Sequence, residues 1–110
     1  MILNDVQSKL NETNVAGYEK PDSIEKLGQL INSHSKNGNK LCPSGALHSM
    51  GGQQFIGGGT VISNEYFQTI QNLNPISKSV DVESGVTWPM LVNWLNTTQK
   101  TEETPLSIIQ

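Results

Sequence analysis

The first clear pattern along the chain is a run of apolar residues at helical spacing within residues 22–36. These positions share one face of a predicted helix: Ile24, Leu27, Leu30 and Ile31. Asp22 and Glu25 stand three residues apart at its start, which is the spacing of a capping box. The helix is expected to end near Lys36, because Asn37-Gly38-Asn39 is a typical C-terminal stop.

A second helix is predicted from Trp88 to about Gln99, with Thr87 as its N-cap. Between and around the helices, short apolar or alternating runs predict five strands: residues 14–18, 41–43, 60–63, 69–73 and 79–83. Residues 106–109 have the composition of a further strand. The order of elements is approximately β-α-β-loop-β-β-β-α, so the sequence predicts an α/β (α+β) fold.

Glycine is concentrated in residues 45–59, which hold six of the ten glycines of the chain. Such a stretch is too glycine-rich for a helix or strand interior and predicts a long ordered loop. Its backbone N–H groups can bind phosphate or pyrophosphate, helped by hydroxyl donors such as Ser44 and Ser49. The loop lacks the Gly-Lys-Ser/Thr ending of a P-loop and a proper G-x-G-x-x-G pattern. A loop that merely turns the chain therefore remains an alternative.

Charge, length and hydrophobicity indicate which partners are not expected for this chain. The 110 residues predict one domain, and the seven basic side chains are all Lys against ten acidic ones. Without Arg or a basic patch, nucleic acid is not an expected partner. No apolar run reaches the roughly 20 residues of a membrane helix, so no membrane is expected either. Residues 1–5 do not resemble a signal peptide, and one Cys excludes an internal disulfide framework, which together favour a cytoplasmic protein.

Three residues have side chains that ligate soft metals: His34, Cys42 and His48. Their spacing fits no zinc pattern, and Cys42 lacks the local signature of a Cys–His hydrolase. We expect Cys42 to be a small buried strand residue and His34 to be structural near a helix end. His48 lies within the glycine-rich loop, where a base, a nucleophile and an exposed bystander are all compatible with the sequence.

Four segments resemble, in the same order, the vanillyl-alcohol oxidase / p-cresol methylhydroxylase family of FAD-binding oxidoreductases. They are residues 4–11 with Val15, Pro21-Asp22-Ser23-Ile24-Glu25-Lys26-Leu27, residues 45–53 (Gly-Ala-Leu-His-Ser-Met-Gly-Gly-Gln), and residues 82–91. In that family a Gly-x-x-His-Ser segment followed by Gly-Gln wraps the FAD pyrophosphate. Leu47 departs from the pattern, since Arg often precedes this His.

The resemblance implies that FAD is the cofactor and that a short segment around the glycine-rich loop binds it. The implied cofactor-binding residues are Ser44, Gly45, Ala46, Leu47, His48, Ser49, Met50, Gly52 and Gln53. His48 falls where many members join a histidine covalently to the flavin, and a neutral imidazole is a competent nucleophile for that bond. No residue of this chain is implied as catalytic.

The resemblance covers only the first subdomain of a PCMH-type FAD-binding fold. We therefore expect residues 1–110 to be a partial domain, without the second FAD subdomain and the substrate domain. Its partner would be the remainder of a flavin-dependent oxidoreductase that transfers hydride from an alcohol- or sugar-type substrate to FAD. The chain alone is expected to be inactive. The alternative is a non-enzymatic α/β module that binds a nucleotide or a protein.

Overall fold

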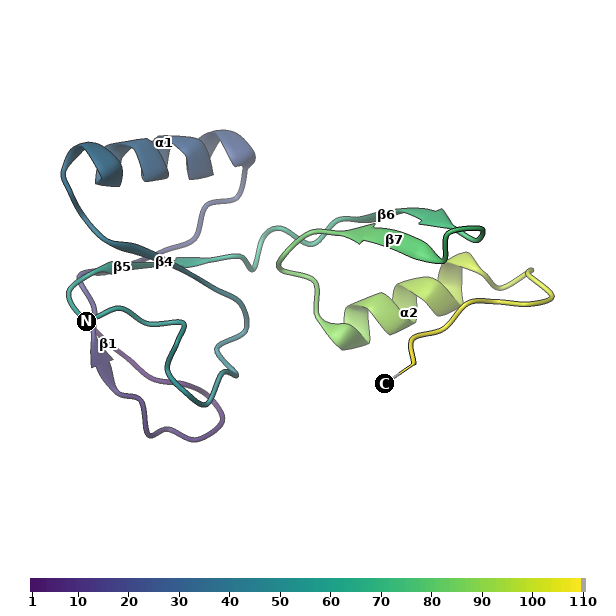
Figure 1. The fold of residues 1–110 in the computed structure, drawn as a ribbon, viewed down its shortest axis with the longest axis horizontal. Coiled ribbons are helices and arrows are strands. Elements are labelled where there is room, and N and C mark those ends of the chain that lie inside the picture. The colour runs from purple at the N-terminus through teal and green to yellow at the C-terminus, as the bar shows by residue number, and fades with distance from the viewer. Residues whose placement is uncertain (110) are drawn as a thin grey trace. The chain divides into compact units, whose positions relative to one another are not determined.

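A computed structural model describes residues 1–109, which divide into two compact units, Met1–Phe67 and a second from Gln68 onward. The first unit contains β1 (Ile2–Leu3), β2 (Thr13–Asn14), β3 (Gly17–Glu19), α1 (Ile24–Lys36), β4 (Leu41–Ser44) and β5 (Thr60–Ser63). The second contains β6 (Ile70–Asn74), β7 (Ser79–Val82) and α2 (Trp88–Thr98) (Figure 1). The predicted mixed α/β fold is confirmed.

The first unit is built on a parallel sheet in the order β3-β5-β4. All four residues of β5 are buried, because this central strand has neighbours on both edges. Val61 of β5 packs with Val15 and Phe55 to form the core of this unit. Helix α1 lies on one side of β4 and β5, and β1 lies on the other (Figure 1). The glycine-rich loop contributes Phe55 to this core, and its Leu47 packs against it.

The N-cap of helix α1 lies one residue later in the chain than predicted. Ser23 is the N-cap, and its hydroxyl accepts a hydrogen bond from the Lys26 backbone N–H at 3.2 Å. The expectation that Asp22 caps this helix is wrong, since its carboxylate forms an ion pair with the Lys26 ammonium at 2.8 Å. The helix ends as predicted, with Asn37 as its C-cap. No residue of α1 is buried, and Ile24 is 71% exposed.

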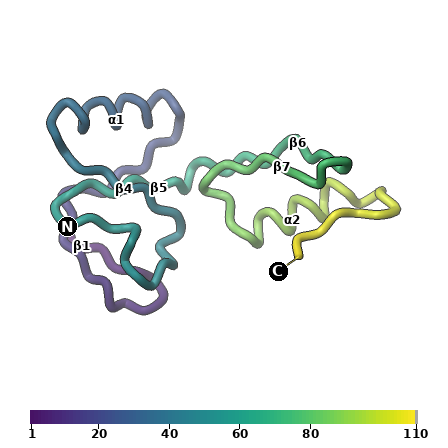
Figure 2. Tube along the Cα trace, in the orientation of Figure 1, coloured from purple at the N-terminus to yellow at the C-terminus, as the bar shows by residue number. Residues whose placement is uncertain are grey.

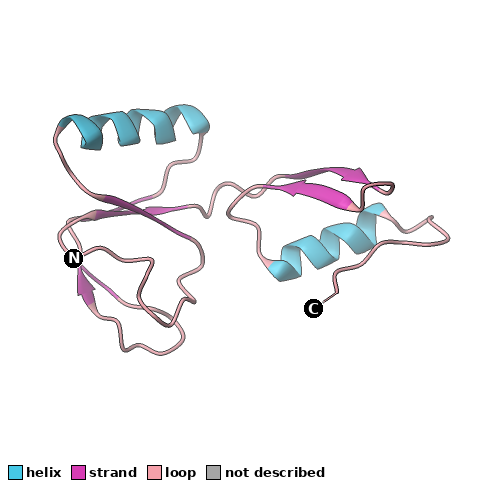
Figure 3. Cartoon of the chain, in the orientation of Figure 1, coloured by secondary structure: helices cyan, strands magenta, loops and turns pink. Residues whose placement is uncertain are grey.

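The predicted strand over residues 14–18 is two strands that belong to different sheets. β2 pairs with β1 in an antiparallel hairpin, whereas β3 joins the parallel sheet. Between them the Val15 N–H donates to the Met1 carbonyl and the Ala16 N–H donates to the Gly59 carbonyl. The chain therefore passes from one sheet to the other at this point. Loops occupy much of this unit on the side of β1 (Figure 3).

The second unit pairs β6 and β7 in an antiparallel hairpin and carries α2, whose Leu91 and Leu95 are buried. Thr87 is the N-cap of α2 as predicted, but its side chain makes no capping hydrogen bond. The strand expected at residues 106–109 is absent from the described part of the chain. There the Gln99 side chain holds the tail instead, accepting from the Leu106 N–H at 2.8 Å and donating to its carbonyl at 2.9 Å. Neither helix has the length and apolar character needed to cross a membrane.

Candidate functional site

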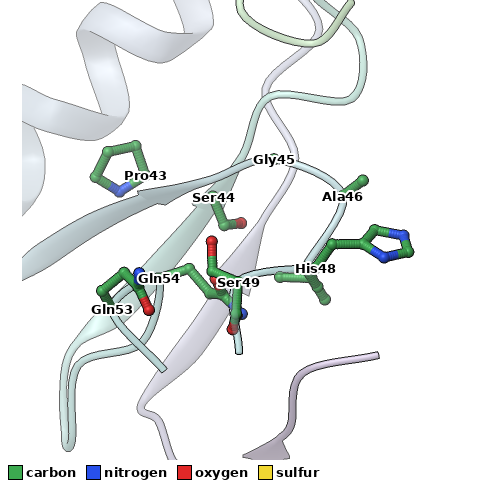
Figure 4. Close-up of a pocket in the computed structure, with 9 residues that line it drawn as sticks. Pro43, Ser44, Gly45, Ala46, His48, Ser49, Gln53 and Gln54 are labelled. Atoms are coloured by element: carbon green, nitrogen blue, oxygen red, sulfur yellow. The ribbon is translucent and has the colours of Figure 1, made fainter. Parts of the chain in front are cut away.

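A pocket of about 480 Å³ opens where β4 runs into the glycine-rich loop, the segment of residues 45–59. Its lining is contributed by nine residues: Pro43, Ser44, Gly45, Ala46, Leu47, His48, Ser49, Gln53 and Gln54. Figure 4 shows the polar side chains of Ser44, Ser49 and Gln54 on one side of the loop, while the His48 imidazole points away from them. The pocket has neither Lys nor Arg among its lining residues, so an anion in it has no permanently charged side chain to pair with.

The backbone of the glycine-rich loop supplies such donors. Among residues 1–109, seven consecutive N–H groups donate no hydrogen bond, those of residues 45–51. Five of them belong to residues that line the pocket, Gly45, Ala46, Leu47, His48 and Ser49. Leu47 has a φ of 61°, in the left-handed region that favours glycine. A left-handed residue turns the chain sharply, and such turns bring successive N–H groups to face one concavity that binds anions. The half-buried Leu47 side chain packs against the core of Val15, Phe55 and Val61 and so holds this turn.

The pocket gathers seven of the nine residues that the sequence implied: Ser44, Gly45, Ala46, Leu47, His48, Ser49 and Gln53. Met50 and Gly52 lie in the next turn of the loop, outside the lining. Pro43 and Gln54 line the pocket but were not anticipated. Gln54 is only 6% exposed, and its amide donates to the Ser49 carbonyl at 3.0 Å, which ties the two ends of the pocket rim together.

The three residues considered as ligands for a soft metal, His34, Cys42 and His48, do not come together in the structure. His48 is exposed, with its Nδ1 at 3.3 Å from the Gln7 Oε1, whereas the His34 Nδ1 lies 3.4 Å from the Asn39 amide. Cys42 is half-buried on β4 rather than fully buried as expected, and its thiol faces the Gln53 carbonyl at 3.6 Å. Within residues 1–109, no three His, Cys, Asp or Glu side chains are arranged to hold a metal ion.

The N-terminal segment, residues 4–14, lies beside the glycine-rich loop (Figure 2). Its centre is Asp5, a carboxylate that is only 1% exposed. Burial raises the pKa of Asp5, but hydrogen bonds from the Asn11 amide, from the Ser8 N–H and hydroxyl, and from the Lys9 N–H outweigh burial. The pKa therefore lies well below its usual range. Sequence patterns did not single out Asp5, because its donors come from an irregular loop without periodicity.

The low pKa of Asp5 predicts a specific loss of stability in acid. A carboxyl with a depressed folded pKa stabilises the protein above its unfolded pKa of about 3.9 and loses that contribution as the pH falls toward the folded pKa. Asp5→Asn should therefore lower the melting temperature most at pH 7, and the difference from the original protein should shrink as the pH falls below about 4. The exposed Asp81→Asn is the matched control. A difference that is the same at every pH would contradict the assignment.

A mixed α/β unit with an uncommitted row of backbone N–H groups after a parallel strand defines a domain suited to a phosphate-bearing cofactor. Over residues 15–110 the sequence matches a family described as "FAD binding domain". Since the match spans most of the chain, the protein belongs to this family of FAD-binding domains: it is a flavoprotein domain, and FAD is its cofactor. No curated protein matches the sequence.

The described residues fit this cofactor. The diphosphate of FAD is an anion, and five uncommitted N–H groups belong to residues that line a pocket without Lys or Arg. Two of the lining residues, Gly45 and Ala46, carry no bulky side chain, which lets a ligand approach the backbone closely. Ser49 adds a hydroxyl donor, whereas the buried Ser44 hydroxyl already donates a long hydrogen bond of 3.4 Å to the Ile62 carbonyl. The fit therefore rests on backbone and hydroxyl donors.

Proposed function

We propose that this chain supplies the diphosphate-binding part of an oxidoreductase of the vanillyl-alcohol oxidase / p-cresol methylhydroxylase type. The observation that carries the proposal is the uncommitted N–H row of Gly45–Ser49 along the pocket. These groups would donate to the FAD diphosphate, joined by the Ser49 hydroxyl and by the Ser44 hydroxyl once it turns from the Ile62 carbonyl. Gln53 and Gln54 would shape the opposite rim, and Met50 and Gly52 would hold the turn between the two rims.

The bound flavin would supply the acceptor for a hydride, which is chemistry that no side chain can perform. In this proposal the substrate is of the alcohol or sugar type, and it is bound by further parts of the oxidoreductase. The role of residues 1–110 is to bind and orient the cofactor. We therefore expect little or no turnover from this chain alone, and the remainder of the oxidoreductase is its proposed protein partner.

The test is titration of the cofactor-free protein with FAD, FMN and ADP. Binding of all three is measured by isothermal titration calorimetry, and binding of the two flavins also by their fluorescence. FAD should bind more tightly than FMN, because FMN lacks the diphosphate that the N–H row is proposed to hold. ADP should bind detectably for the same reason. Equal affinity for FMN and FAD would contradict the assignment of the diphosphate to this loop. Binding of ADP with no gain for FAD would favour the alternative, a non-enzymatic nucleotide-binding module.

His48 is the proposed point of covalent attachment. An imidazole nitrogen would bond to the methyl carbon on the benzenoid edge of the flavin as one methyl C–H bond and the imidazole N–H bond break. The two electrons would pass to the flavin itself and from it to dissolved oxygen, so the incubation is carried out in air. Its imidazole is exposed and leaves one nitrogen free, since Nδ1 faces Gln7. After incubation with FAD, acid precipitation should leave flavin fluorescence on the original protein and remove it from His48→Ala. His34→Ala is the matched control and should behave like the original protein. Flavin released completely from the original protein, with binding intact, would show that His48 only lines the site.

A further inference from the structure

Two carbonyl groups of the glycine-rich loop are held by the N-terminal segment. The Val6 N–H donates to the Leu47 carbonyl at 2.9 Å, and the Asn11 side-chain amide donates to the Met50 carbonyl at 2.6 Å. A third bond at 3.0 Å joins the Gly58 N–H to the Asn14 carbonyl. The N-terminal segment therefore contacts the loop near its start, middle and end.

These bonds fix the direction of the neighbouring N–H groups. A trans peptide is planar, so its C=O and the following N–H point in opposite directions. With the Leu47 and Met50 carbonyls turned toward the N-terminal segment, the N–H groups of His48 and Gly51 must point away from it. The N-terminal segment thus occupies these two carbonyl acceptors of the loop and leaves the two N–H donors that follow them for a ligand.

Asn11 is the residue of the N-terminal segment whose side chain bonds to the glycine-rich loop. Its Nδ2 donates both to Met50 and to the buried Asp5 carboxylate, at 2.9 Å for the latter, and its backbone N–H donates to the Asn4 Oδ1 at 2.9 Å. The Asn11 side chain also packs against Gly52, where a Cβ would lie 3.0 Å from the Asn11 Cβ. Asn11 is therefore held by Asp5 and contacts the loop at Met50 and Gly52.

We propose that Asn11, held by Asp5, is a positioning residue that preorganises the glycine-rich loop for its anionic ligand. This inference rests on the proposed function of that loop as the diphosphate site. A loop already held in its binding conformation loses less entropy on binding, so its affinity is higher. Residues 4–14 also lie outside the matched FAD-binding region, which begins at residue 15.

Asn11→Asp tests the inference without changing side-chain size. It replaces the amide donors by a second carboxylate beside Asp5. When two carboxylates are in contact, their repulsion strongly raises the pKa of one of the two groups. At low pH the introduced group is protonated and can donate one hydrogen bond again. The titratable side chains on the two segments are Asp5, Lys9 and Glu12, and His48 on the loop. These four are common to both proteins, so comparison with the original protein isolates the new pair.

FAD affinity is measured from pH 5 to pH 8. Asn11→Asp should bind FAD at least about tenfold more weakly than the original protein at pH 8 and regain most of that loss at pH 5. Asn11→Ala should be weaker at every pH, because it has no donor to recover. Asn32→Asp places the same charge on the exposed surface of α1 and should match the original protein. A loss in Asn11→Asp that does not change with pH would overturn the inference.

Hydrogen exchange on the cofactor-free proteins at pH 7 separates this inference from the proposed function. The Phe55 N–H donates to the Gly52 carbonyl within the loop, whereas the Leu27 N–H reports on helix α1. In both Asn11 variants the Phe55 amide should exchange at least about tenfold faster while Leu27 is unchanged. Unchanged Phe55 protection, or equal loss at Leu27, would overturn the positioning role. Failure of the original protein to bind FAD, with Phe55 affected, would instead reject the proposed function.

Discussion

Gly59→Ala is expected to destabilise the N-terminal unit by about 3 kcal/mol. A Cβ at this position would lie 2.9 Å from the Lys40 carbonyl oxygen and 2.5 Å from the Ile56 Cγ2. The same Lys40 carbonyl accepts a hydrogen bond from the Thr60 N–H at 2.9 Å, next to the pairing of β4 with β5. Because backbone atoms cannot rotate aside as a flexible side chain does, relief requires the sheet to shift. Urea denaturation followed by circular dichroism measures the loss.

Gly57→Ala is the matched control for this prediction. A Cβ there meets nothing within 4 Å, and the residue does not have a left-handed backbone. Its effect should stay within about 0.5 kcal/mol, as is usual for surface substitutions. Equal stability losses for Gly57→Ala and Gly59→Ala would show that the close approach to Lys40 is not what requires a glycine.

Gly52→Ala is expected to weaken FAD binding by about tenfold and to lower stability by about 1–2 kcal/mol. The residue has a φ of 70°, and a Cβ would lie 3.0 Å from both the Cβ and the Oδ1 of Asn11. The substitution therefore combines backbone strain with displacement of the side chain that holds Met50. Calorimetric titration with FAD gives the affinity, and thermal unfolding gives the stability.

Gly58→Ala separates the two effects. Gly58 has the same φ of 70°, but a Cβ there would enter open space. It should lose stability through backbone strain while FAD affinity falls less than in Gly52→Ala. If both variants bind FAD equally, the contact with Asn11 contributes nothing to the pocket, and only the backbone conformation matters.

The regular elements were predictable where the chain repeats a simple pattern. Strand β5 and the end of α1 at Lys36 match the sequence prediction because an apolar run and an Asn-Gly stop are local signals. The prediction of one strand over residues 14–18 was wrong. The chain forms two strands there because of hydrogen bonds to Met1 and Gly59 that no local pattern encodes. The cap of α1 was misplaced by one residue because Asp22 and Ser23 are both good cap residues. In the structure Ser23 is the cap and Asp22 pairs with Lys26 instead.

The pocket was predictable in part for a related reason. Its main lining is contiguous in sequence, so one resemblance located seven of its residues together. The contact between the N-terminal segment and the glycine-rich loop was not predicted, because the bonds of Val6, Asn11 and Asn14 to that loop come from an irregular segment. Contacts of this kind depend on three-dimensional closure rather than on periodicity or composition.

The absence of Lys and Arg from the pocket lining has a consequence for selectivity. Peptide N–H groups act at hydrogen-bond range, whereas charged side chains produce a field that attracts anions from a distance. With a formal net charge of −3, the protein as a whole does not draw anions toward itself. Abundant small anions of the cell therefore gain little at this loop, and a ligand is retained only when its shape brings several of its atoms into register with the peptide groups.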